Sequence, residues 1–197
     1  MNLKYLLRPY FKLNLFITSL EVILPFILIQ TDYIQLFFQF FIGIASWNFL
    51  EYIYHYYIQH KYFYSIHKKH HDFPINLKYI HLSLCLTQCL IPFFSFIFWN
   101  NLYMLSGLCF GGIIFELCHT MSHKKLNGTI KKILFRNVKA YHKYHHLKSN
   151  VNFGFSTPSY DYLFGTLDKS IVLPNYILIL GLFTPILLIP VDLKIFK

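Results

Sequence analysis

Residues 101–123 read NLYMLSGLCFGGIIFELCHTMSH, an apolar run that ends in two histidines. As a helix with a rise of about 1.5 Å per residue, positions 101–118 are long enough to cross about 30 Å of hydrocarbon. His119 and His123 follow where the apolar run stops, one helical turn apart. The stretch therefore predicts a membrane-spanning helix that presents imidazoles at one face of the bilayer.

Three further apolar segments have a similar length: 13–30, 33–54 and 82–99. Two-residue links at 31–32 and 100–101 join the four segments in pairs, which predicts two helical hairpins. The composition agrees, because 55% of the residues are hydrophobic and the mean hydropathy is +0.43. A soluble domain of this size needs more polar surface.

Basic residues are distributed unevenly around these segments. The chain has 18 Lys and Arg against eight Asp and Glu, and neither hairpin link carries a basic residue. By the positive-inside rule, the N-terminus and the polar segments 55–81 and 119–170 face the cytoplasm. A net charge of +10 can also indicate nucleic-acid binding, but no basic stripe lies on a soluble module, so we expect no nucleic-acid partner.

The expected fold is an all-α integral membrane protein with about four transmembrane helices in two hairpins and a cytoplasmic helical cap. Residues 1–197 are expected to form a single domain. The stretch 171–190 contains three prolines, which tend to break helices. It therefore predicts either a further crossing or a re-entrant or interfacial segment. The four cysteines lie in apolar stretches and are interpreted as packing residues.

Ten of the eleven histidines lie in two windows, 55–71 and 119–146, and each window begins where an apolar segment ends. In HKKHH (67–71) and HKYHH (142–146), the histidines at i, i+3 and i+4 share one helix face. Imidazole suits iron, copper, nickel and zinc, and ten ligands exceed what one ion can use. The pattern therefore predicts two metal ions in the cytoplasmic cap. The ten candidate ligands are His55, His60, His67, His70, His71, His119, His123, His142, His145 and His146.

Two carboxylates precede the histidines. Glu51 lies one turn before His55, and Glu116 lies three residues before His119. Because an ionisable group at the end of an apolar helix is costly without a partner, we predict that each orients a ligand imidazole through its other ring nitrogen. Direct metal ligation and a plain boundary position are the alternatives.

The stretches WNFLEYIYHYYIQH, HKKHH, ELCHTMSH and AYHKYHH, followed by NFGFSTPSYDYLFGTL, resemble the fatty acid hydroxylase and sterol desaturase superfamily over about residues 47–168. Members carry these histidine motifs at the cytoplasmic ends of membrane helices, and in their pattern all ten histidines bind two metal ions. The resemblance implies two iron ions, with zinc possible in the purified protein. It also implies a monooxygenase that hydroxylates a lipid C–H bond with O2.

The first and last stretches are most similar to fatty acid 2-hydroxylases, which implies a fatty acyl chain or sphingolipid as substrate. Only six residues separate His60 from His67, an interval more similar to carotenoid and sterol hydroxylases and desaturases, which are the alternative. The chain has no His-Pro-Gly-Gly motif, so the resemblance implies a b-type cytochrome and its reductase as separate electron donors. It implies a multi-pass membrane location with a cytoplasmic site, in the endoplasmic reticulum if the source is eukaryotic.

Three alternative functions other than an oxygenase fit the histidine pattern less well. A zinc hydrolase needs fewer imidazoles than ten. A metal transporter would place its histidines within the spans rather than at their ends. A catalytically inactive relative is expected to have lost some ligands, and none of the ten is missing.

Overall fold

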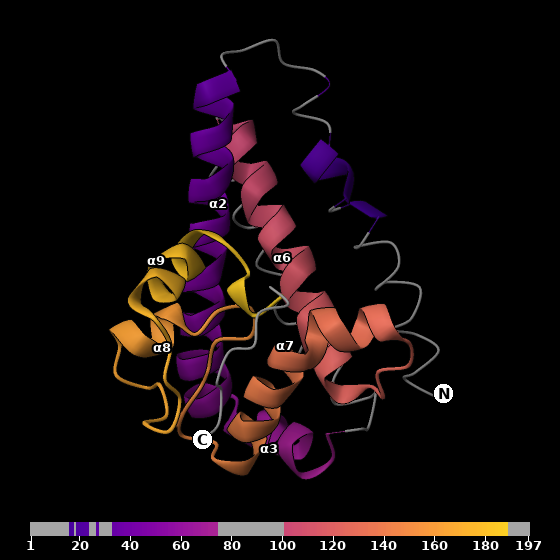
Figure 1. Ribbon diagram of the computed structural model, residues 1–197, viewed down its shortest axis with the longest axis vertical. Helices are drawn as coiled ribbons and strands as arrows, with labels where there is room; N and C mark the ends of the chain where they lie inside the picture. The colour runs from indigo at the N-terminus through magenta and orange to yellow at the C-terminus, as the bar shows by residue number, and fades with distance from the viewer. Residues whose placement is uncertain (1–15, 18, 24–26, 28–32, 75–100, 189–197) are drawn as a thin grey trace. The chain divides into compact units, whose positions relative to one another are not determined.

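The computed structural model describes residues 16–17, 19–23, 27, 33–74 and 101–188. It divides into two compact units, one of residues 1–47 with 63–113 and the other of residues 48–62 with 114–197. Throughout the described ranges the secondary structure is helical, which confirms the expected all-α class (Figure 1). The expected span 82–99 and most of 13–30 lie outside the described residues.

The helices follow the apolar and histidine-rich stretches in chain order. They are α2 (Tyr33–Ile53), the π-helix η1 (Tyr54–Tyr62), α3 (Tyr64–Asp72), α6 (Leu102–His123), α7 (Thr129–Leu147), α8 (Ser159–Leu163), α9 (Asn175–Phe183) and the 3₁₀ turn η2 (Ile186–Leu188). In α2, α3, α6 and α7 the chain adopts the helices that the sequence predicts.

By length and composition, two of these helices can cross a membrane. The first is the continuous helix Tyr33–Tyr62, with 30 residues, and the second is Leu102–His123, with 22. They correspond to the expected spans 33–54 and 101–118. The arrangement of four spans in two hairpins stays a prediction.

Within the first unit, glycines bring α2 and α6 into backbone contact. A Cβ atom on Gly107 would collide with the carbonyl oxygen of Phe40, and one on Gly43 would collide with that of Met104. Small residues permit this approach between apolar helices, where dispersion contacts and not the hydrophobic effect hold them together. The two helices are therefore packed at a distance that only glycine allows.

We expect Gly107→Ala to destabilise the protein by about 1–3 kcal/mol, because the added methyl group must displace backbone atoms and cannot simply move a side chain. Thermal unfolding in detergent measures this effect. Leu117→Ala, at a position on the same helix whose side chain is 37% exposed, is the control and should change the melting temperature less. Equal melting temperatures for Gly107→Ala and the unchanged chain would contradict the close packing.

In the second unit, α7 presents one buried stripe. Its apolar members Val138 and Tyr141 pack in a core with Cys118, Ile186 and Leu187. The stripe continues toward the C-terminal end of the helix as His142 and His145, which are also buried. Because the same helix face forms the core and carries the histidines, core packing fixes where the imidazoles point.

Candidate metal centre

The π-helix η1 brings together two histidines that an α-helix would separate. His55 and His60 are five residues apart, which places them about 140° apart around an α-helix at about 100° per residue. A π-helix is bonded from i to i+5, so residues five apart come into register. The two Nε2 atoms accordingly lie 3.3 Å apart. The α-helical periodicity of the sequence does not predict this π-helix, although a pair of candidate ligands spaced by five is a signal for it.

The first histidine group of the second unit consists of His55, His60 and His145. The Nε2 atom of His60 lies 3.1 Å from that of His145, in addition to its approach to His55. The Nδ1 atom of His55 lies 2.6 Å from the carbonyl oxygen of Phe153, and Nδ1 of His145 lies 2.7 Å from that of Val151. A carbonyl oxygen only accepts, so both Nδ1 atoms donate and each Nε2 of a neutral imidazole is left with its lone pair.

This group fits a metal cation. The lone pairs of His55 and His145 both face Nε2 of His60, which can donate at most one proton. The ligand atoms of the three residues lie within 4.8 Å of one another. A cation placed among them would satisfy all three nitrogens, whereas hydrogen bonding satisfies at most one contact.

The second group consists of His119 and His123 from α6 with His142 from α7, and its ligand atoms also lie within 4.8 Å of one another. Nε2 of His142 lies 2.8 Å from that of His123 and 2.9 Å from that of His146. Burial, followed by the neighbouring imidazoles, lowers the pKa of His142 well below its usual range. The neutral imidazole that results is the form that binds metals.

In the first unit, α3 carries the other histidine triplet. His67 and His70 are buried, and Nε2 of His71 lies 3.0 Å from Nε2 of His67. The helical spacing of the triplet is as predicted. That these three residues share the metal ions of the other seven stays a prediction.

A loop between α7 and α8 supplies the two carbonyls that orient the first group, and Asp161 holds this loop. Its Oδ1 accepts hydrogen bonds of 2.7 Å from the Phe153 amide and the Thr166 hydroxyl. Its Oδ2 accepts from the Gly154 amide at 2.7 Å and the Tyr141 hydroxyl at 2.9 Å. Asp161 is fully buried. Asp161 was not among the predicted site residues, although it is the only acidic residue between positions 151 and 167.

Glu51 holds the same loop at the next two residues, Phe155 and Ser156. Its carboxylate accepts hydrogen bonds from the Phe155 amide and from the amide and hydroxyl of Ser156, the latter two at 3.1 and 3.0 Å. The imidazole of His55, its predicted partner, is oriented by the Phe153 carbonyl. Glu116 is buried as well. A role of either glutamate toward a ligand imidazole stays a prediction.

The aromatic ring of Phe155 contacts both histidine groups. Its centroid lies 4.6 Å from that of His55, and 4.7 Å from those of His119 and His142. The side chain is 1% exposed. The buried ring of Phe155 therefore fills the space beside both groups, a role that its sequence position alone does not reveal.

Comparison with known proteins agrees with this chemistry. The model of the fatty acid hydroxylase family matches residues 40–166. One dihydroceramide fatty acyl 2-hydroxylase of Arabidopsis thaliana is 29% identical over 145 residues, which cover 65% of this chain and 60% of that protein. A second from the same plant is 27% identical over 146 residues, covering 64% and 58%.

The chain thus spans less than two thirds of the length of these two relatives. No solved structure matches it. The match to the family model extends over most of the chain and includes all ten clustered histidines. The chain belongs to the fatty acid hydroxylase family.

Proposed function

We propose that the protein is a membrane-bound dimetal oxygenase that hydroxylates a lipid C–H bond with O2 and externally supplied electrons. The observation that carries the proposal is the convergence of imidazole nitrogens in two groups, in a chain of the fatty acid hydroxylase family. The similarity to dihydroceramide fatty acyl 2-hydroxylases supports a fatty acyl chain or sphingolipid as substrate. No feature of the described residues favours a hydrolase or a transporter over this reaction.

The proposed ligands are the ten clustered histidines, and the proposed metals are two iron ions. For His67, His70 and His71 the proposal rests on the sequence pattern. Bound iron would supply the activation of O2, in a net reaction that converts R–H, O2, two electrons and two protons into R–OH and water. Zinc also suits an all-imidazole site, so the metal found in a purified sample need not be the working one.

The protein's own residues contribute geometry. The carbonyls of Val151 and Phe153 fix the tautomers of His145 and His55, so that both Nε2 lone pairs face the same space. Partners of this kind raise the basicity of a ligand and hold its ring in place. Phe155 keeps the space beside the rings apolar. A dry, shaped site is what oxidation of an unactivated C–H bond needs from the protein.

The proposed function also requires an electron donor and a membrane location. Two electrons per turnover would come from a b-type cytochrome and its reductase, and the site would face the cytoplasm, at the endoplasmic reticulum in a eukaryote. The helices Tyr33–Tyr62 and Leu102–His123 support a membrane location through their length and composition.

Expression in a host that supplies a cytochrome reductase system tests this function. Mass spectrometry of ceramide and free fatty acyl chains should show a hydroxylated product, one oxygen heavier, that is absent with the empty vector. Iron reconstitution should give two ions per chain. A product lighter by two hydrogens would indicate desaturation instead, and unchanged lipids with fewer than two ions per chain would contradict the oxygenase assignment.

A further inference from the structure

Helix α9 is apolar on the face that it turns outward. Tyr176, Ile179, Leu180 and Phe183 follow the i, i+3, i+4, i+7 pattern of one helix face, and each is between 43% and 62% exposed. No residue from 170 to 188 is charged. Soluble proteins rarely expose a contiguous apolar surface, so contact of this face with water is unfavourable.

Helix α9 is too short to cross a bilayer by itself. The helix has nine residues, about 14 Å at 1.5 Å per residue, which is less than half of a hydrocarbon core of about 30 Å. After Phe183 the chain turns back, and Ile186 and Leu187 are fully buried in the core beneath α7. The Leu187 amide donates to the carbonyl oxygen of Ser156 at 3.0 Å. Of the alternatives for 171–190, the structure favours a re-entrant or interfacial segment.

Side chains of the protein donate hydrogen bonds to backbone carbonyls in the last turn of α9. The Thr184 hydroxyl donates to the Leu180 carbonyl at 2.8 Å. The side-chain amide of Asn48 donates to the carbonyls of Gly181 and Leu182 at 3.4 and 3.3 Å. In water the last carbonyls of a helix can be solvated, whereas in lipid each one needs a partner from the protein.

An apolar residue of a candidate span lies beside the α8 region. Asn48 and Phe49 lie in the helix Tyr33–Tyr62, and Phe49 is 40% exposed. The ring of Phe49 lies 5.6 Å from that of Tyr160 and 6.3 Å from that of Phe164, both from the α8 region. The α8 region therefore adjoins the span helix through the ring of Phe49, and the C-terminal end of α9 adjoins it through Asn48.

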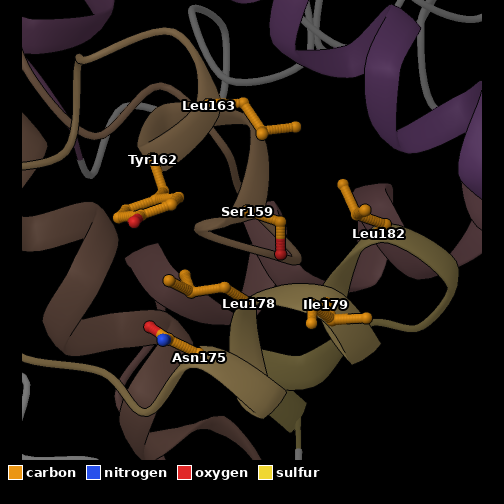
Figure 2. Close-up of a pocket in the computed structure, with 7 residues that line it drawn as sticks. All are labelled: Ser159, Tyr162, Leu163, Asn175, Leu178, Ile179 and Leu182. Atoms are coloured by element: carbon orange, nitrogen blue, oxygen red, sulfur yellow. The ribbon is translucent and has the colours of Figure 1, made fainter.

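A groove runs between α8 and α9 on this face. Figure 2 shows Tyr162 and Leu163 on one side of it, and Leu178, Ile179 and Leu182 on the other. Its volume is about 250 Å³ and it is open to the outside. Ser159 and Asn175 are the polar members of an otherwise apolar and aromatic lining. Part of a lipid acyl chain can therefore fill the groove, whereas water would gain few hydrogen bonds there.

We propose that the α8–α9 face lies within one leaflet of the bilayer without crossing it, and that an acyl chain of a bilayer lipid occupies the groove. The polar turn after α8, with Asp168 paired to Lys148 at 3.1 Å, would stay at the aqueous boundary. Tyr162 and Tyr176 have the amphipathic rings that favour that boundary. This surface acts as an in-plane membrane anchor, whatever reaction the histidines support.

Spin labels in the full chain test this placement. The variants Leu180→Cys and Ile179→Cys, on the outward side of α9, and Lys169→Cys, in the polar turn, would be labelled and reconstituted into phosphatidylcholine vesicles. The label on the unchanged chain supplies the background from the native cysteines. At both α9 positions, collisions with O2 should exceed those with a water-soluble nickel chelate several-fold, and Lys169→Cys should show the reverse. Measured from the surface of the hydrocarbon core, both α9 labels should lie at a depth of less than about 15 Å, which is half of its thickness.

Nickel access at Leu180→Cys equal to that at Lys169→Cys would overturn the proposal. So would labels at Tyr176→Cys and Phe183→Cys that report opposite leaflets, since the segment would then cross. A phosphatidylcholine with a diazirine near the end of one acyl chain tests the groove in the unchanged protein. Crosslinks on the peptides that contain residues 159–163 and 175–182 are expected. Crosslinks on the span helices without any on these peptides would contradict occupation of the groove.

Discussion

His145→Ala should remove one of the two metal ions and lower turnover by more than about 100-fold, beyond the loss typical of residues that only support a ligand. The imidazole of His145 points its Nε2 lone pair at the space shared with His55 and His60, and its Nδ1 is tied to the Val151 carbonyl. Without His145, only His55 and His60 of the first histidine group remain, so the coordination that the three imidazoles would provide is incomplete. Iron per chain after anaerobic reconstitution measures the first effect, and hydroxylated product the second.

His142→Ala is the complementary change in the other group, where Nε2 of His142 lies within 3 Å of the Nε2 atoms of His123 and His146. Each variant alone should retain about one ion, and the double variant should retain none. Lys132→Ala, on an exposed turn of the same helix, is the control and should keep both ions. Two ions per chain in His145→Ala, with a gel-filtration profile like that of the parent, would contradict the assignment of His145 as a ligand.

The features that the sequence predicted are those set by local periodicity. An apolar run of membrane length predicts a helix because its backbone must be satisfied internally, and α2 and α6 confirm this. The triplets His67, His70 and His71 and His142, His145 and His146 share a helix face because i, i+3 and i+4 do so on any α-helix. These inferences need no knowledge of what the rest of the chain does.

The features that the sequence did not predict depend on departures from that periodicity or on distant contacts. The α-helical rule separates His55 from His60, and only the π-helix η1 brings their nitrogens to 3.3 Å. The contacts of Glu51 with the Phe155 and Ser156 amides join residues more than 100 positions apart. Nothing in the spacing near Glu51 distinguishes a loop anchor from a partner of the adjacent imidazole.

Asp161→Asn is expected to lower the free energy of unfolding by about 3 kcal/mol, or about 10 °C in melting temperature for a chain of this length. Burial raises the pKa of Asp161, and the four donated hydrogen bonds oppose that shift. The asparagine side chain has the same shape, but an NH2 group replaces one of the two carboxylate oxygens. The two carboxylate oxygens of Asp161 face different backbone amides, those of Phe153 and Gly154. In either orientation, the NH2 group of the asparagine therefore faces a backbone N–H group, of Phe153 or of Gly154, that cannot rotate away.

The same substitution should weaken metal binding by about 10- to 100-fold, because the Phe153 amide that loses its acceptor belongs to the residue whose carbonyl orients His55. Asp168→Asn is the matched control, since Asp168 lies in the same region but pairs with the exposed Lys148, and a surface pair contributes at most about 1 kcal/mol. Unfolding in detergent and competition with a metallochromic chelator measure the two effects. Loss of stability with unchanged metal affinity would show that Asp161 supports the loop alone. Equal behaviour of both variants would contradict its position as the anchor of the metal-orienting carbonyls.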